Sequence, residues 1–180
     1  MGHFPGDYDK QGRLVRDRKR NSYKYSPDRD LLLEVTLDSG LVITYLYDSR
    51  GRLVGRRDSS GTWVDQYFYG DPSRPHLVTH AFRPKEGALT TLVYDGDDRL
   101  IFVQAGSTAS YYVVTDRMGS PVQFYTDMGL LVRQVTRIPY GEVTQDTSPH
   151  LGVPIGFGGA IYDPDAQLLH FQVKTDLPFL

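Results

Sequence analysis

Short runs of alternating apolar and polar residues, each followed by a turn, make up most of this chain. Residues 52–57 form one such run, residues 58–61 are small and polar, and residues 62–69 form the next run. Alternation with a period of two places neighbouring side chains on opposite faces of a strand. Gly61, which ends the polar stretch, can take the positive φ that tight turns need. The pattern predicts a β-hairpin over residues 52–69.

The same pattern continues elsewhere, and no segment carries a clear helical period. Residues 30–34 have a helical composition, but the β-rich residues on both sides of Asp38-Ser39-Gly40 predict another hairpin. Pro72, Pro75 and Pro84 fall where connections between strands are expected. The sequence therefore predicts an all-β protein built from successive antiparallel hairpins.

One motif recurs along the chain with a pitch near 22 residues. Tyr-Asp-x-x-Gly-Arg-Leu occupies residues 8–14 and 47–53 and returns at 94–100, where Asp98 stands in the Gly position. Degenerate copies lie at 115–119, 126–131 and 162–169, and Tyr25 and Tyr69 fall at the matching phase. A fixed pitch of this length indicates a repeat architecture. The predicted structural positions of the repeat turns are Tyr8, Asp9, Gly12, Tyr47, Asp48, Gly51, Tyr94, Asp95, Asp116, Gly119, Tyr162 and Asp163.

Each residue type in the motif has a physical role in such a turn. Asp accepts hydrogen bonds from the backbone two residues on, and Gly supplies the positive φ. Tyr ends the preceding strand, where its large body supports the neighbouring strand. A hairpin of about 20 residues cannot bury its apolar side alone, so we expect the repeats to stack into one continuous sheet.

Composition removes several classes of protein. Among the 180 residues, 19 of the 22 acidic residues are Asp, there are 13 Tyr, and there is no Cys. Few helix formers disfavour a helical bundle, and the lack of Cys excludes a disulfide scaffold, Cys-ligated zinc and a thiol nucleophile. A net charge of −2 gives no electrostatic case for nucleic acid or an anionic membrane. No targeting segment or apolar run of the roughly 18–20 residues needed to span a membrane is present.

Three groups of residues have the composition of a metal, catalytic or nucleotide-binding site, and the sequence favours none of these roles. His76 and His80 have a zinc-ligand spacing only on a helix, whereas the residues between them favour a strand, which would separate the two side chains by about 13 Å. The Asp residues could pair as a glycosidase acid and base, but nearly all sit in turns. Residues 156–159 lack the third Gly of a dinucleotide loop and indicate a tight turn. We therefore predict no catalytic residue, no cofactor-binding residue and no metal site.

The segment Arg16-Asp17-Arg18-Lys19-Arg20 is the most basic part of the chain. Such a run can dock nucleic acid or a heparan-type glycan, or it can be a solvated hairpin end. We favour the hairpin end.

The repeat motif resembles that of the YD or Rhs repeat family. Residues 115–122, 139–142, 156–164 and 168–171 follow the order of the Rhs-associated core of that family. The sequence of residues 155–164, together with Leu168-Leu169-His170-Phe171, resembles animal teneurins more than bacterial Rhs proteins. The resemblance covers about residues 8–171.

The resemblance implies a spiralling β-sheet that forms part of a barrel-like shell. It divides the chain into YD repeats at residues 1–114, a core-like segment of the same shell at residues 115–171, and a divergent tail at residues 172–180. The family normally continues differently after His170-Phe171, so the chain is expected to be a fragment, a truncated gene model or a spliced form. As a piece of a shell it would leave sheet edges exposed.

The resemblance also implies a non-catalytic, structural and adhesive role on the extracellular side of the plasma membrane, as part of a single-pass membrane protein. The implied partners are proteins, either a second teneurin or a latrophilin-type receptor, in cell adhesion and neuronal or synaptic recognition. Nucleic acid, and membrane contact by this segment itself, are not expected. The alternative is an Rhs-type shell that encloses a C-terminal toxin; a third possibility, an enzyme, has no motif to support it.

Overall fold

The computed structural model describes residues 6–139 and 141–171. The chain divides into two compact units, Met1–Gln66 and Tyr67–Leu180. Strand β7 crosses the boundary between them. The division at residue 114 expected from the motifs stays a prediction, and the tail at residues 172–180 lies outside the described residues.

The described residues are almost entirely strand and turn. The strands are β1 (Asp7–Tyr8), β2 (Leu14–Arg16), β3 (Ser22–Tyr25), β4 (Leu32–Thr36), β5 (Val42–Tyr47), β6 (Leu53–Asp58), β7 (Trp63–Phe68), β8 (His80–Arg83), β9 (Ala88–Tyr94), β10 (Leu100–Ala105), β11 (Ala109–Thr115), β12 (Pro121–Tyr125), β13 (Leu131–Arg137), β14 (Val143–Asp146), β15 (Ile161–Asp163) and β16 (Leu168–His170).

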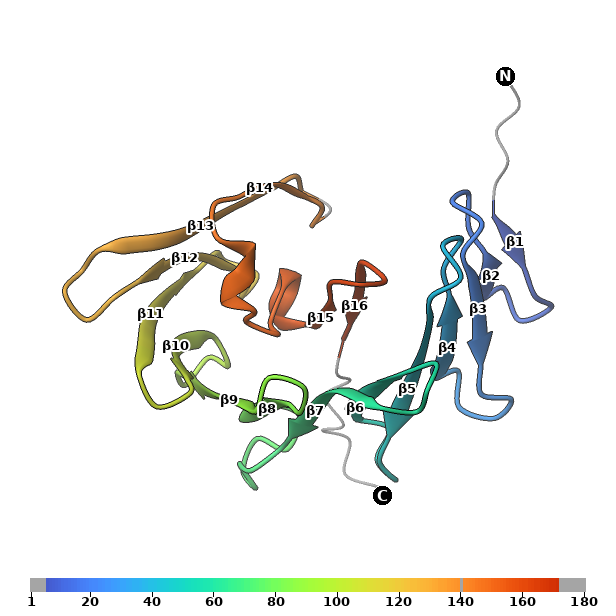
Figure 1. The fold of residues 1–180 in the computed structure, drawn as a ribbon, viewed down its shortest axis with the longest axis horizontal. Helices are drawn as coiled ribbons and strands as arrows, with labels where there is room; N and C mark the ends of the chain where they lie inside the picture. Colours follow the sequence, from blue (N-terminus) through green and yellow to red (C-terminus); the bar gives the residue numbers. More distant parts are fainter. Residues whose placement is uncertain (1–5, 140, 172–180) are drawn as a thin grey trace. The chain divides into compact units, whose positions relative to one another are not determined.

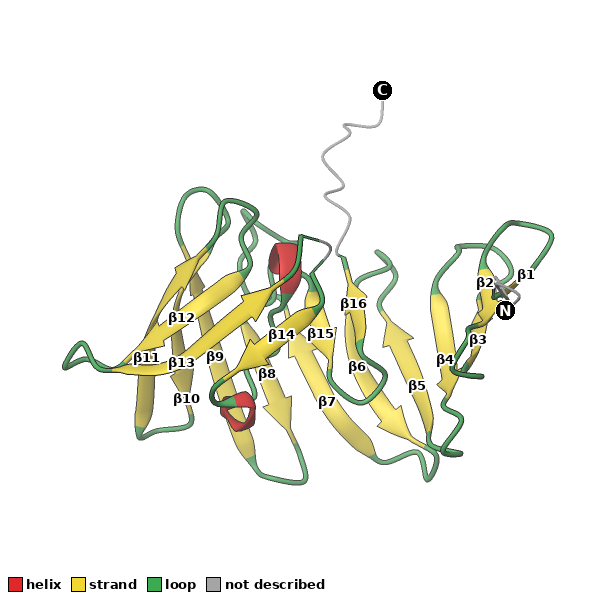
Figure 2. Ribbon diagram, turned by 90° about the horizontal axis from the view of Figure 1, so that it is seen from above, coloured by secondary structure: helices red, strands yellow, loops and turns green. Residues whose placement is uncertain are grey.

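Strands β1 to β14 are hydrogen-bonded in the order of the chain, and β15 and β16 form a separate pair. The described pairings are antiparallel, with turns joining successive strands (Figure 2). The prediction of an all-β fold of successive hairpins is confirmed. The hairpins expected over residues 30–47 and 52–69 are the pairs β4–β5 and β6–β7.

A β-bulge accompanies most of these turns. The register shifts between Leu46 and Tyr47 in the β5–β6 pair and between Val114 and Thr115 in the β11–β12 pair. A turn that ends in a residue with positive φ places such a bulge beside it, and the extra residue increases the local twist. The repeat therefore adds twist to each unit at regular intervals.

In the first unit, alternation along each strand buries one face of the sheet. Val35 pairs with Ile43 across β4 and β5, and both are buried. Tyr45 and Leu53 are also buried, at 2% and 0% exposure. These residues come from successive strands, so the core is assembled by stacking hairpins, as expected for a repeat protein.

In the second unit, a C-terminal segment packs against the buried face. Strands β8 to β13 curve around residues 148–171 (Figures 1 and 2). Arg83 of β8 donates a hydrogen bond to the carbonyl of Gly152 at 2.5 Å, and Gly158 N donates to Ser120 Oγ at 3.0 Å. The buried residues of this core include Leu92, Leu100, Val103, Val113, Phe124, Val135, Val153, Ile155, Ala160 and Ile161.

Two single-turn 3-10 helices lie in this segment, where no helix was predicted. They are η1 (Pro149–Leu151) and η2 (Phe157–Gly159). Gly158 and Gly159 take φ values of +62° and +76°, so the glycine-rich stretch is the tight turn expected of it, closed by hydrogen bonds spanning three residues. No helix in the described part of the chain is long and apolar enough to cross a membrane.

The prediction of a strand between His76 and His80 is wrong. Residues 71–79 form a connection, and β8 begins only at His80. Turn hydrogen bonds run from Arg74 N to Asp71 O at 3.2 Å and from Leu77 N to Arg74 O at 3.0 Å. These consecutive turns continue as far as Leu77, so β8 starts only after them.

Candidate functional site

The Asp side chain of the repeat motif organises its turn. Asp48 Oδ1 accepts hydrogen bonds from Arg50 N at 2.9 Å and from Arg52 N at 3.0 Å. Gly51 N donates to Asp48 O at 3.0 Å, and Gly51 has a φ of +78°. This carboxylate therefore serves as a hydrogen-bond acceptor that closes the turn.

The same geometry recurs in the other copies of the motif. The carboxylates of Asp9, Asp95 and Asp116 each accept the backbone N–H groups two and four residues on, at 2.9 Å. Gly12 and Gly119 take φ values of +80° and +83°. All of these groups are fixed by contacts within five residues.

Two copies depart from the pattern in an informative way. Asp98, in the Gly position of the third copy, holds a φ of +62°, a conformation that Asp tolerates better than most residues. In the copy at residues 126–131, Thr126 is the turn acceptor: its Oγ1 accepts Leu130 N at 3.2 Å, and Gly129 N donates to Thr126 O at 3.0 Å. Thr126, and not the adjacent Asp127, therefore holds the acceptor position of this copy.

The last copy, at residues 162–169, forms a different loop. Asp163 is fully buried, and its Oδ1 accepts Asp165 N at 2.9 Å and Ala166 N at 3.2 Å. Asp163 pairs with Leu168, and the positive φ falls on Gln167 at +56°. The positive-φ residue thus lies one place further along than in the other copies.

Tyrosines at the motif phase donate hydrogen bonds from their hydroxyl groups to backbone carbonyls. Tyr47 Oη donates to Leu32 O at 2.9 Å, and Tyr94 Oη donates to Val78 O at 2.9 Å. Tyr25, at the matching phase, donates to Leu14 O at 3.0 Å. Burial raises the pKa of Tyr47 to about 12. The hydroxyls of Tyr25 and Tyr47 tie their strands to the preceding strand, and that of Tyr94 ties β9 to the connection before β8. Tyr8, by contrast, is 59% exposed.

The arginine of the motif has a role that sequence reasoning missed. Arg13 Nε donates to Asp9 Oδ2 at 2.7 Å, and its Nη1 reaches Ser26 O and Asp30 Oδ1 at 3.0 Å. Its guanidinium also lies 5.0 Å from the ring centre of Tyr25. Arg52 likewise donates to Asp48 Oδ2 at 2.7 Å. The recurrence of Arg after the Gly position in successive copies of the motif was the sequence signal for this role.

A buried ion pair lies on the inner face of the first unit. Arg56 and Asp65 are 3% and 7% exposed, and Arg56 Nε donates to Asp65 Oδ2 at 2.7 Å. The two residues are cross-strand partners in β6 and β7. Breaking a buried ion pair costs about 3–5 kcal/mol, so the pair links β6 and β7.

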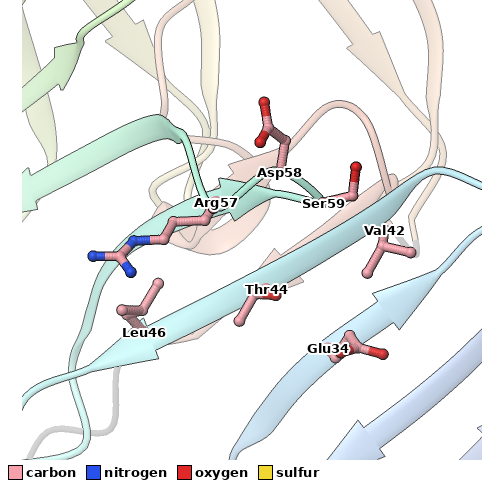
Figure 3. Close-up of a pocket in the computed structure, with 8 residues that line it drawn as sticks. Glu34, Val42, Thr44, Leu46, Arg57, Asp58 and Ser59 are labelled. Carbon is pink, nitrogen blue, oxygen red and sulfur yellow. The ribbon is translucent and has the colours of Figure 1, made fainter.

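An open groove of about 490 Å³ lies on the opposite face of the first unit (Figure 3). Glu34, Thr44, Leu46 and Arg57 line it from three strands, and Lys24 pairs with Glu34 at 2.5 Å. The Arg57 guanidinium lies 4.1 Å from the ring centre of Trp63. Apolar and charged side chains share the lining: Glu34 is paired with Lys24, and Arg57 Nε is buried without a hydrogen-bond partner among the described residues.

His76 and His80, which share a zinc-ligand spacing in the sequence, contact different partners. His76 Nε2 lies 3.0 Å from Asp98 Oδ2, and His80 Nδ1 lies 3.0 Å from Thr79 Oγ1. A cavity of about 130 Å³ beside His76 is lined by Tyr94, Asp98 and residues of the C-terminal segment. No group of three or more candidate metal ligands occurs within residues 6–139 and 141–171.

The basic segment lies at the end of the β2–β3 hairpin. Asp17 turns inward and accepts hydrogen bonds from Asn21 N at 2.9 Å, Asn21 Nδ2 at 2.8 Å and Tyr23 Oη at 2.7 Å. Burial alone would raise the pKa of Asp17, but these donors hold it below its usual value. Arg16 and Arg20 remain exposed on the hairpin end.

Sequence comparison places this arrangement among known proteins. Residues 2–177 match the family model "Teneurin YD-shell". Teneurin-m of Drosophila melanogaster is 37% identical over 168 residues, which are 93% of this chain and 6% of that protein. Teneurin-1 of Gallus gallus is 34% identical over 170 residues, which are 94% of this chain and 6% of that protein.

Solved structures show the same fold at much lower identity. The crystal structure of TcdB2-TccC3-TEV matches with a TM-score of 0.66 at 15% identity, over 92% of this chain and 9% of that one. The crystal structure of TcdB2-TccC3 matches with a TM-score of 0.62 at 14% identity, over 87% of this chain and 8% of that one. The chain spans about 6% of the length of the teneurins that it matches. On the family match and these identities, the chain belongs to the teneurin YD-shell family.

Proposed function

We propose that this chain is a structural and adhesive part of an extracellular YD shell and carries no catalytic site. The observation that carries the proposal is how the motif side chains are used. Carboxylates that an enzyme could employ accept backbone N–H groups in turns, as at Asp9 and Asp48. We assign the repeat-turn positions named above a structural role in holding successive hairpins of the shell together.

The proposed partners are proteins. Membership in the teneurin family supports contact with a second teneurin or with a latrophilin-type receptor, at the surface of cells that adhere or form neuronal contacts. The proposed location is the extracellular side of the plasma membrane, within a single-pass membrane protein. Residues 1–114 and 115–171 would contribute repeats and a core-like segment to the same shell.

An adhesion assay tests the proposal with the chain itself. Fluorescent beads coated with the folded 180-residue chain are offered to cells that display the same chain, cells that display a latrophilin-type receptor, and cells that display neither. We expect beads to adhere to at least one of the first two populations. Beads coated with urea-unfolded chain are the control. Equal adhesion to all three populations, or none, would contradict the proposal.

The alternative, an Rhs-type shell around a toxin, is supported by fold likeness to the TcdB2-TccC3 structures alone. The gene around this segment discriminates between the two. Upstream EGF-like cysteines and a membrane-spanning helix agree with the adhesive role, whereas a secretion module and a variable toxin region downstream would contradict it.

A further inference from the structure

A row of apolar side chains, three of them exposed and two half-buried, crosses five strands of the second unit. The cross-strand partners Val93, Phe102, Tyr112, Tyr125 and Leu131 are in register from β9 to β13. We call these five residues the apolar row. The rings of Phe102 and Tyr112 meet edge to face, with centroids 5.5 Å apart. A row in register presents its side chains as one continuous strip.

The apolar row lies on the face of the sheet that the C-terminal segment does not cover. Its neighbours along the strands, Leu92, Val103 and Val113, are buried on the other face. Side chains alternate between faces, so the row points away from them. Tyr112, Leu131 and Val93 are 57%, 46% and 42% exposed, whereas a sheet face inside a core would be covered.

The rows beside the apolar row contain no charged residue. On one side Thr91, Gln104 and Ser110 are partners across β9, β10 and β11. On the other side Val114, Gln123 and Gln134 are partners across β11, β12 and β13. Depletion of charge around exposed aromatic and aliphatic side chains is typical of the centre of a protein–protein interface.

The first unit shows that a charge-free row is not a general property of the exposed sheet faces of this chain. The corresponding row there is Lys24, Glu34, Thr44, Arg57 and Trp63, again partners across five strands. It carries three charged side chains, with an ion pair and a cation–π contact. Its charged side chains are readily hydrated, whereas the apolar row contains no charged side chain.

We propose that the apolar row is a contact surface for a second copy of this chain. A two-fold contact brings a surface patch against itself, so a charged patch repels its copy and a neutral apolar patch complements it. Two sheets can also pack face to face through such strips, about 10 Å apart. The inference rests on the proposed adhesive function, because it assigns the contact between two copies to a defined surface.

The size of the strip sets the strength of the contact. With aromatic side chains of roughly 150–250 Å² each and smaller aliphatic ones, the exposed fractions give an apolar area of about 300–400 Å². This lies in the lower part of the range of about 300–600 Å² typical of the largest apolar patch on a monomer. It is below the roughly 800 Å² that each partner buries in a stable interface. The contact is therefore weak in solution and is strengthened when many copies are displayed on a surface.

Sedimentation equilibrium of the full 180-residue chain tests the proposal, at concentrations up to about 1 mM. We expect reversible self-association that Tyr112→Lys weakens at least tenfold. Phe68→Lys is the matched control, because Phe68 is 47% exposed on β7 and lies outside the apolar row. The control should leave self-association unchanged. Circular dichroism spectra and urea midpoints of both variants verify that each is folded.

A charge-pair experiment tests whether the two rows face each other. Tyr112→Lys and Tyr112→Glu should each fail to self-associate, and an equimolar mixture should recover association, because opposite charges then meet across the two-fold axis. The proposal is overturned if the wild-type chain stays monomeric, if Tyr112→Lys and Phe68→Lys have equal effects, or if the mixture does not recover.

Failure of this inference can be told apart from failure of the proposed function. Beads carrying Tyr112→Lys that adhere as well as wild-type beads to cells displaying the chain leave adhesion intact and overturn the role of the row. Wild-type beads that adhere only to receptor-displaying cells, with loss of adhesion in Tyr112→Lys, assign the row to a different protein and also overturn it.

Discussion

Replacing Asp48 by Ala removes the acceptor at the centre of one repeat turn. Asp48 Oδ1 holds the backbone N–H groups of Arg50 and Arg52, and Oδ2 accepts Arg52 Nε at 2.7 Å. The side chain is 22% exposed, so water reaches part of the site in the variant. We therefore expect the turn to loosen without collapse of the β5–β6 pair.

The size of the effect follows from these contacts. A hydrogen bond to a charged group contributes about 1.5–3 kcal/mol in a buried site, whereas an exposed ion pair contributes about 0–1 kcal/mol. Water can replace part of what Asp48 provides, so the expected loss is about 1–2 kcal/mol, comparable with the loss of a helix cap.

The effect also depends on pH in a defined direction. Burial alone would raise the pKa of Asp48, but the backbone N–H and guanidinium of Arg52 outweigh it and hold the pKa below the ordinary value of 3.8. The stability that Asp48 contributes is then fully present above the unfolded pKa, about 3.9. It is lost as the pH falls through the lower pKa of the folded state. The difference between wild type and Asp48→Ala should therefore be constant from neutral pH to about pH 5 and shrink below about pH 4.

Urea unfolding followed by circular dichroism measures the difference, with Asp38→Ala as the matched control. Asp38 lies in a turn with the same backbone bonds: Leu37 N donates to Leu41 O at 2.8 Å, and Gly40 N donates to Leu37 O at 2.9 Å. Leu37 holds the acceptor position there, and the exposed Asp38 carboxylate accepts no hydrogen bond within the described residues. Equal losses in both variants, or a loss for Asp48→Ala that persists unchanged at pH 3, would refute the reasoning.

Three further changes test other parts of the fold by the same unfolding measurement. Gly51→Val should lower the free energy of unfolding by about 1–2 kcal/mol, because Gly51 has a φ of +78°. Gly51→Asp should lower it less, since Asp98 holds a φ of +62° at the equivalent position. The reverse order of the two variants would contradict this assignment. Tyr47→Phe should cost about 1 kcal/mol through its lost hydroxyl bond. Because the Tyr47 pKa is raised to about 12, that stability is present below about pH 10 and is lost as the pH rises toward 12; a phenol titrating near 10 in the folded chain would exclude this. Asp65→Asn should cost about 3 kcal/mol, because Arg56 stays buried without its charged partner, and a neutral result would show that the pair does not stabilise the fold.

Local features of the fold were predictable because their contacts span few residues. The hydrogen bonds of the Asp48 turn lie within residues 48–52, so the spacing of Asp and Gly in the sequence is enough to indicate them. The degenerate copy at residues 126–131 shows the limit. There Thr126 provides the acceptor, and two adjacent polar residues offered two possible alignments one residue apart.

Contacts between distant residues were not predictable in this way. The carboxylate of Asp98 meets His76, 22 residues earlier, and Arg83 reaches Gly152, 69 residues later. The repeat pitch does not by itself identify these partners, because they depend on how many hairpins lie between the two residues and how each one twists. The 3-10 turns near the C-terminus likewise depend on packing inside the second unit.

The sequence by itself determined the repeat, the turns and the all-β class, because each depends on local backbone preferences and on alternation with a period of two. Only the tertiary structure decided which residues share an exposed face. A slip of one residue moves every side chain to the other face of a sheet, and each bulge introduces such a slip. The apolar row around Tyr112 and the charged row around Thr44 thus follow from the register of five strands each, which no single repeat specifies.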